Sequence, residues 1–376
     1  MTGLICCTMD CNLACEYCFE GNGYKKNMPD IKNINEVFIK NTQLINKFIN
    51  ELYQWNLGKN TTIIWHGGEP TLIRSDVLEK IMQEHENQKI RWAIQTNGTL
   101  LTNKYIDIFK KYNVNVGISL DGLKKHHDKY RVMKNGKPTF DLIMKNIRLL
   151  QAEKVIVNVL LTITNQNVND LIEIYKFCAA YKLNINFNAL YPTSHKCIVD
   201  LNENEYTDKI CELFDYWIQD YKNRIIIVPF LKIIEGIMYP NVGISVCHWR
   251  KNCSKSMIAI DMEGDLYNCE HWIGEKEFCI GNIRNGLERT IKSKNTLFAD
   301  RIEHLEKQEC YGCEIYKLCY GGCPWNAREL FGNENRKDAS ICEGRKKIIR
   351  HIYEYMKNTT KQKIPDKNTW KIGGEI

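Results

Sequence analysis

Six predicted strands alternate with predicted helices over the first half of the chain, and this alternation constrains the fold more than any other feature. The apolar strand-like runs lie at residues 4–9, 61–65, 91–98, 114–122, 155–163 and 185–190. Apolar residues at helical spacing occupy residues 33–55, 75–88, 103–112, 139–152 and 168–181 between them. Such alternation favours a parallel sheet covered by helices and wound with right-handed connections. We therefore expect an α/β fold, with too few units for an eight-stranded barrel.

Polar and glycine-containing motifs follow four of these predicted strands. They are Cys11–Cys18, the run His66-Gly67-Gly68-Glu69-Pro70, the run Gln95-Thr96-Asn97-Gly98 and the run Ser119-Leu120-Asp121-Gly122. In parallel barrels the chemistry lies at the carboxyl ends of the strands. We therefore expect these motifs to surround one cavity.

The first motif has three cysteines, Cys11, Cys15 and Cys18, in the pattern C-x3-C-x2-C. Thiolates hold [4Fe–4S] clusters, and three of them leave the fourth iron open to a small molecule. The alternatives are three structural cysteines or a zinc knuckle. Zinc sites usually collect four ligands in two spaced pairs, and this loop has no fourth Cys or His.

Bulk composition limits the class of protein. The 376 residues suffice for two or three domains. The sequence contains no run of 18 apolar residues that would form a transmembrane helix. It also shows no signal peptide, which would have a basic segment followed by an apolar one. The chain has 52 basic and 45 acidic residues, a net charge of +7, without long charged runs. Seventeen cysteines point to metal ligation in a reducing compartment. We expect a cytoplasmic protein of an anaerobe that binds neither nucleic acid nor membrane.

The cysteine pattern, with Tyr17 before its last member, resembles the signature of the radical S-adenosylmethionine (SAM) enzymes. That resemblance implies a partial (β/α)6 barrel, SAM bound at the open iron, and a 5′-deoxyadenosyl radical that abstracts a hydrogen atom from the substrate. Gly67-Gly68-Glu69-Pro70 resembles the family's GGEP motif, and residues 119–131 resemble the anaerobic sulfatase-maturing enzymes. The SAM contacts that the resemblance implies are Tyr17, Gly67, Gly68, Glu69, Gln95, Asn97, Ser119, Asp121, Arg131 and Leu190.

Eight further cysteines resemble the SPASM extension of that superfamily, a small cysteine-rich α+β domain. The family's interleaved ligation assigns Cys247, Cys253, Cys269 and Cys323 to auxiliary cluster I. It assigns Cys310, Cys313, Cys319 and Cys342 to auxiliary cluster II, for three [4Fe–4S] clusters in all. Two zinc ribbons are the rival interpretation, because they need the same eight ligands. Cys178, Cys197, Cys211 and Cys279 fall outside this pattern, and we interpret them as structural.

Glu270 marks a departure from the sulfatase-maturing enzymes. In those relatives an Asp general base follows the third cysteine of the first auxiliary site, and here Glu270 follows Cys269. Glu270 keeps a carboxylate that is one methylene longer, and His271 beside it also has the chemistry of a base. A solvated glutamate beside a cluster ligand is the alternative. The replacement puts formylglycine formation in doubt.

The resemblance implies an enzyme that modifies a residue within a peptide or protein. We favour maturation of a ribosomal peptide by crosslinking or oxidation, with auxiliary clusters accepting an electron and a flavodoxin or ferredoxin as electron donor. The alternatives are a sulfatase-maturing enzyme that converts Cys or Ser to formylglycine, and a non-catalytic iron–sulfur electron carrier. The expected domains are a radical SAM barrel (1–200), a connecting helical segment (201–243), a SPASM domain (244–345) and a C-terminal helix and tail (346–376).

Overall fold

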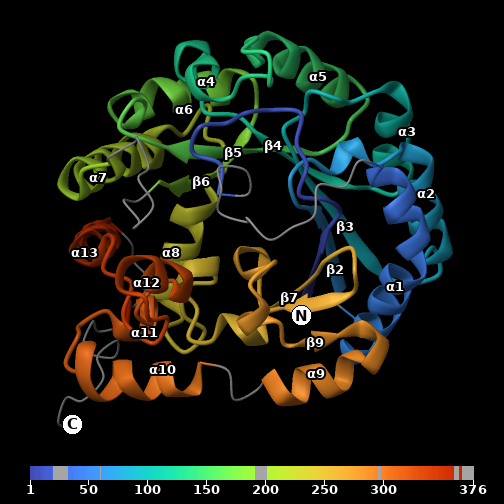
Figure 1. The fold of residues 1–376 in the computed structure, drawn as a ribbon. Coiled ribbons are helices and arrows are strands. Elements are labelled where there is room, and N and C mark those ends of the chain that lie inside the picture. The colour runs from blue at the N-terminus through green and yellow to red at the C-terminus, as the bar shows by residue number, and fades with distance from the viewer. Residues whose placement is uncertain (20–32, 60, 191–200, 295–297, 360–363, 366–376) are drawn as a thin grey trace. The chain divides into compact units, whose positions relative to one another are not determined.

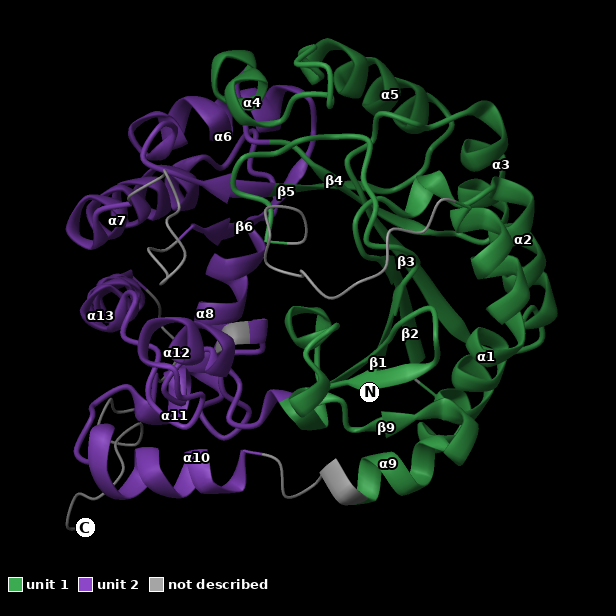
Figure 2. Ribbon diagram, viewed as in Figure 1, with its two compact units in different colours: residues 1–120, 124–160, 254–297 green, residues 121–123, 161–253, 298–376 purple. Residues whose placement is uncertain are grey.

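The computed structural model describes residues 1–19, 33–59, 61–190, 201–294, 298–359 and 364–365. These residues form two compact units (Figure 2). Unit 1 holds residues 1–120, 124–160 and 254–297, and unit 2 holds residues 121–123, 161–253 and 298–376. Cys197 lies outside the described residues, so its interpretation stays a prediction, as do the expected domain bounds.

Unit 1 is built on a parallel sheet in which the strands follow one another in chain order. The registers Thr2↔Thr62, Ala93↔Asn115 and Val116↔Val157 join neighbouring strands in parallel. The strands are β1 (Thr2–Cys6), β2 (Thr61–His66), β3 (Ile90–Thr96), β4 (Asn115–Ser119) and β5 (Val157–Ile163), whose last residues belong to unit 2. The predicted α/β alternation is confirmed, and the sheet is open rather than a closed barrel.

Helices cover the outer face of this sheet (Figure 1). The apolar side chains whose spacing predicted the helices face the core, as Phe48, Ile49 and Leu52 of α1 do, which are fully buried. Burial of each such side chain contributes about 1.5–3 kcal/mol to the free energy of folding. The helices of unit 1 are α1 (Ile34–Trp55), α2 (Ser75–Glu84), α3 (Asn103–Lys111), α4 (Lys124–Tyr130), α5 (Phe140–Ala152) and α9 (Leu287–Lys294). The short α4 was not expected from the sequence.

Three strands from the cysteine-rich part of the sequence extend the sheet of unit 1. β7 (Met257–Ile260) pairs in parallel with β1, in the register Thr2↔Met257. β8 (Asp265–Tyr267) and β9 (Gly281–Asn282) add antiparallel to it. The segment that carries Cys269 and Glu270 therefore belongs to the same unit as the C-x3-C-x2-C loop. The sequence did not indicate this arrangement.

Unit 2 contains the edge strand β6 (Asn184–Ala189) and a set of packed helices. The Phe214 ring makes edge contacts with Phe230 at 5.3 Å and Tyr355 at 5.5 Å, which ties three helices together. Its helices are α6 (Leu171–Ala180), α7 (Glu203–Gln219), α8 (Val228–Met238), α10 (Ala299–His304), α11 (Tyr316–Cys319), α12 (Pro324–Phe331) and α13 (Cys342–Thr359). None of the helices in the described ranges is long and apolar enough to cross a bilayer.

Candidate active site

The C-x3-C-x2-C loop follows directly from β1 and is fixed by backbone hydrogen bonds. Ala14 N–H donates to the Val132 carbonyl at 2.8 Å, and Lys134 N–H donates to the Asn12 carbonyl at 3.3 Å. β1 ends at Cys6, earlier than the sequence indicated, because the chain turns into this loop. Cys15 is buried, whereas Cys11 and Cys18 are half-buried.

The two glycines after β2 let the chain lie against the cysteine loop. Gly68 N–H donates to the Thr8 carbonyl at 2.7 Å, and a Cβ on Gly68 would lie 2.2 Å from the Asp10 carbonyl oxygen. Gly67 has φ +111°, and a Cβ there would lie 2.3 Å from the Thr8 carbonyl oxygen. Close approach of two backbones therefore requires both glycines.

Glu69 is fully buried, and its carboxylate joins two strand ends. One oxygen accepts hydrogen bonds from the Thr71 N–H at 2.9 Å, the Thr71 hydroxyl at 2.5 Å and the Thr96 hydroxyl at 2.7 Å. The other accepts from Asn97 N–H at 2.7 Å. Burial raises the pKa of Glu69, against the hydrogen bonds from Thr71, Asn97 and Thr96. In this structure the carboxylate holds β2 and β3 in place, and its contact with SAM stays a prediction.

Five more predicted SAM contacts lie in unit 1. Asn97 donates from Nδ2 to Cys11 Sγ at 3.6 Å and to Asn12 Oδ1 at 2.9 Å, so it touches the cysteine loop itself. Gln95 donates to the Ser119 hydroxyl at 3.1 Å across neighbouring strands. The Arg131 guanidinium is buried and lies 5.3 Å from the centre of the Tyr17 ring.

Glu270 reaches the carboxyl end of β2. Its Oε2 lies 2.9 Å from His66 Nδ1, and both side chains are largely buried. The same Nδ1 lies 2.8 Å from Gly67 N, so the histidine tautomer decides which of the two hydrogen bonds forms. The neighbouring His271 ring lies 4.4 Å from the ring of Phe19, next to Cys18. The segment after Cys269 therefore contacts both the cysteine loop and the GGEP strand.

Seven of the eight predicted auxiliary ligands lie in unit 2, and Cys269 lies in unit 1. Burial, and then the thiols of Cys319, Cys313 and Cys342, raise the pKa of Cys310 to about 12, so this predicted set is gathered together. Burial, Asp338 and Cys247 raise the pKa of Cys323 to about 12. Of the predicted SAM contacts, Asp121 and Leu190 also belong to unit 2.

The thiols fit iron ligation in their chemistry. Burial raises the pKa of Cys11 to about 11, so its thiol stays protonated at neutral pH unless a metal replaces the proton. Leu13 N–H and Asn97 Nδ2 both point at that sulfur, and such hydrogen bonds tune iron–sulfur centres. No three His, Cys, Asp or Glu side chains converge on a single metal ion within the described ranges. A four-iron cluster instead takes each thiolate at a different iron.

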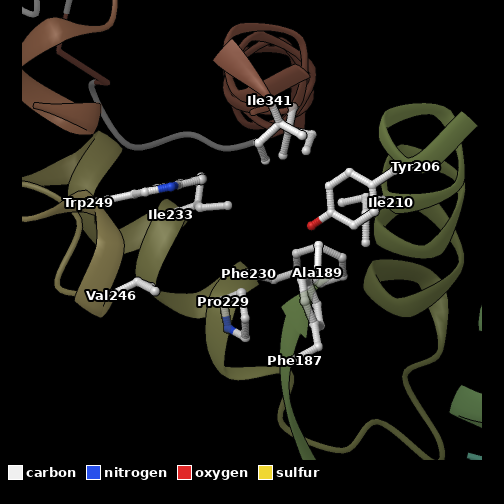
Figure 3. A pocket seen from close by; sticks show the side chains of 11 residues that line it. Phe187, Ala189, Tyr206, Ile210, Pro229, Phe230, Ile233, Val246, Trp249 and Ile341 are labelled. Atoms are coloured by element: carbon white, nitrogen blue, oxygen red, sulfur yellow. The ribbon is translucent and has the colours of Figure 1, made fainter. Parts of the chain in front are cut away.

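Figure 3 shows an apolar pocket in unit 2. Phe187 and Ala189 of β6, Tyr206 of α7 and Phe230 of α8 form part of its wall. Val246 and Ile341, which also line it, each precede a predicted ligand, Cys247 and Cys342. Apolar surroundings of this kind are one determinant of the potential of an iron–sulfur centre.

Comparison with known proteins identifies the family. The model of the Radical SAM superfamily matches residues 5–178. The chain is 32% identical over 364 residues to a cysteine-type anaerobic sulfatase-maturating enzyme of Clostridium novyi, covering 90% of this chain and 91% of that enzyme. It is 25% identical over 369 residues to the radical SAM cyclopropyl synthase TigE of Paramaledivibacter caminithermalis, covering 95% of this chain and 74% of TigE.

The fold agrees with these relationships. The solved structure described as native anSMEcpe with bound AdoMet and Cp18Cys peptide superposes with a TM-score of 0.78 at 24% identity, covering 95% of this chain and 98% of that one. The chain belongs to the radical SAM superfamily, in the family that contains the anaerobic sulfatase-maturating enzymes. Its partial-barrel fold with a SPASM-type extension is the one that the sequence predicted.

The sequence did not single out several residues that build the site. His66, Thr71 and Thr96 contact Glu270 or Glu69, and each lies within or beside a motif that was identified. Their position within or next to a motif was the one feature of the sequence that could have identified these three residues. Arg301, Asp338 and Arg345 in unit 2 are buried charged residues without a motif, and only the structure places them among the cysteines.

Proposed function

We propose that this chain is a maturase that abstracts a hydrogen atom from a residue of a ribosomal peptide and leaves that residue oxidised or crosslinked. The observation that carries this proposal is the Glu270 carboxylate, which lies 2.9 Å from His66 at the carboxyl end of β2. Glu270 takes the proton that the substrate residue loses, and His66 orients the carboxylate. The relationship to TigE, which is named a radical SAM cyclopropyl synthase rather than a sulfatase-maturating enzyme, supports this assignment.

The cofactor set belongs to the same proposal. Cys11, Cys15 and Cys18 would hold the cluster that binds SAM, and the eight later cysteines would hold two auxiliary clusters. Bound there, SAM and its cluster would supply the chemistry of the 5′-deoxyadenosyl radical, and the auxiliary clusters would supply a site for the second electron of the two-electron oxidation. A flavodoxin or ferredoxin in the cytoplasm of an anaerobe supplies the first electron.

Formylglycine formation on a sulfatase is the second candidate, favoured by the match to the Clostridium novyi enzyme over most of both chains. In that reaction the base takes the proton of a substrate thiol or hydroxyl. Glu270 in place of Asp moves the carboxylate along by one methylene, and positioning errors of about 1 Å reduce rates strongly. The two candidates therefore differ in where the substrate atom must lie.

The test uses the anaerobically reconstituted full chain, SAM and dithionite. The probe is a synthetic peptide with a Cys-x-Pro-x-Arg motif, deuterated at the cysteine β-carbon. Deuterium in 5′-deoxyadenosine together with loss of sulfur from the peptide would establish formylglycine formation. Loss of two hydrogens with sulfur retained would establish oxidation or crosslinking of the peptide. The absence of SAM cleavage in a protein with its iron intact would refute both candidates.

Glu270→Gln tests the base. We expect it to keep 5′-deoxyadenosine formation while product formation falls by about 10²–10⁴-fold, the usual contribution of a general base. Glu277→Gln is the matched control, because Glu277 is an exposed carboxylate in the same segment. Equal loss of radical formation and product in Glu270→Gln would indicate a structural role instead.

A further inference from the structure

Unit 2 contains a buried arginine without a carboxylate partner of its own. Arg301 of α10 is 3% exposed. Its guanidinium donates to the backbone carbonyls of Gly321 at 2.9 Å, Gly322 at 3.0 Å and Glu334 at 2.7 Å, and also to that of Arg336. Over the described ranges no Asp or Glu forms an ion pair with it. Four carbonyls satisfy its hydrogen bonds, but its charge remains, because arginine does not deprotonate in proteins.

The position of Arg301 relates it to both predicted auxiliary sites. Gly321 and Gly322 lie in the loop from Cys319 to Cys323, which provides one predicted ligand to each site. Burial lowers the pKa of Arg301, and the groups that oppose this shift are Cys323, Asp338, Cys253 and Cys310. Three of these four groups are predicted cluster ligands, drawn from both sets.

The buried charges around this loop do not cancel. Asp338 is buried, forms an ion pair with the buried Arg345, and accepts a hydrogen bond from Cys323 N–H at 3.1 Å. Gly322 lets the loop pack on that pair, since a Cβ there would lie 2.5 Å from Arg345 Nη1. Among the described buried side chains here, Arg301 and Arg345 are positive and Asp338 is negative, so their formal charges sum to +1. A buried cation without a counter-charge is costly, so anionic groups nearby are needed to balance it.

We propose that Arg301 is the positive charge that raises the reduction potentials of the auxiliary clusters held by the surrounding thiolates. This inference rests on the proposed function, because it requires those clusters. Reduction adds one negative charge to a cluster, and a fixed cation in a poorly screened interior stabilises the reduced form. Net charge near the cluster is one of the determinants of its potential. Arg301 thereby favours acceptance of an electron by the clusters.

The test measures cluster potentials in the full chain. Cys11, Cys15 and Cys18 are replaced by alanine, so that only auxiliary clusters titrate, and wild-type Arg301 is compared with Arg301→Gln and Arg301→Lys. Dithionite titration is followed by electron paramagnetic resonance. Arg301→Gln should lower the ratio of reduced to oxidised cluster at least tenfold at a fixed potential, which is about 59 mV for one electron. Arg301→Lys keeps the charge and should stay near the parent value.

Two further variants keep the test decisive. Arg350→Gln removes an exposed arginine of α13 and should leave the potential unchanged. Asp338→Asn removes the carboxylate from the group of buried charged side chains Arg301, Asp338 and Arg345. It should shift the potential upward, in the direction opposite to the shift caused by Arg301→Gln. If Arg301→Gln does not fold, Arg301→Lys decides, because a potential that moves although the positive charge is kept overturns the inference. Iron at the expected count with unmoved potentials, or shifts of the same sign, overturns the inference and leaves the proposed function standing. Absence of auxiliary iron in the parent refutes the auxiliary clusters themselves.

Discussion

The cysteine loop of unit 1 and the Cys319–Cys323 loop of unit 2 are held by different forces. In unit 1 the loop pairs through backbone hydrogen bonds with residues 132–134 and with the GGEP turn, and the nearby buried carboxylate, Glu69, is satisfied by neutral donors. In unit 2 the loop is held by the buried charged residues Arg301, Asp338 and Arg345.

The difference follows from what each loop is proposed to hold. A cluster that leaves one iron open needs its loop fixed from behind, so that the open side stays free for a small molecule. A fully ligated cluster has no open side, and the protein adjusts it through the surrounding charge. The four predictions below test this contrast, in order of decreasing expected effect.

Replacing Cys11 by alanine should abolish 5′-deoxyadenosine formation and remove about four irons from the protein. Iron analysis and chromatographic measurement of 5′-deoxyadenosine check both results. Cys178→Ala is the control, because Cys178 is buried in α6 and lies outside all three predicted ligand sets. SAM cleavage that survives in Cys11→Ala would contradict the role of the unit 1 loop.

Replacing Asp338 by alanine should destabilise the protein by about 3–5 kcal/mol, because it removes the buried carboxylate that forms an ion pair with the buried Arg345 guanidinium. Burial raises the pKa of Asp338, but Arg345, Ser340 and the Cys323 N–H outweigh burial and hold the pKa below its usual value. The contribution to stability is therefore present above the unfolded pKa of about 3.9 and is lost as pH falls through the lower folded pKa. Urea unfolding between pH 7 and 3 measures both effects, and a pH dependence unchanged by the substitution would contradict this account.

Replacing Gly68 by alanine should cost about 1–3 kcal/mol and disturb the cysteine loop, because the new methyl group meets the Asp10 carbonyl oxygen. Thermal unfolding and iron retention are the measurements. Gly136→Ala provides a comparison, since no atom lies within 4 Å of its Cβ position although φ is +78°. If Gly68→Ala is the milder of the two, close backbone approach does not fix this loop.

Replacing Thr71 by valine should cost about 0.5–1.5 kcal/mol, because Glu69 loses one hydroxyl donor and keeps the other three hydrogen bonds. Equilibrium unfolding measures the change. Thr42→Val removes an exposed hydroxyl of α1 and should change stability by less than about 0.5 kcal/mol. Equal effects at the two positions would show that the buried carboxylate does not depend on this donor.

The sequence alone determined the strand–helix alternation, the cysteine loop and the GGEP motif, because each depends only on the spacing of residues that are close together in the sequence. The period at which apolar residues recur distinguishes a strand from a helix. Parallel strands place their carboxyl ends at the same edge of the sheet. On this basis the contacts of Asn97 with the cysteine loop and of Gln95 with Ser119 follow from strand order.

Only the tertiary structure decided what lies far apart in sequence. The pairing of β7 with β1 brings Glu270 to His66, two residues 204 positions apart by their numbers, and no local pattern signals that pairing. Burial of Arg301 among thiols is likewise invisible in sequence, where an isolated arginine looks like a surface charge. Long-range pairing and desolvation depend on the folded chain as a whole, so local spacing determines neither.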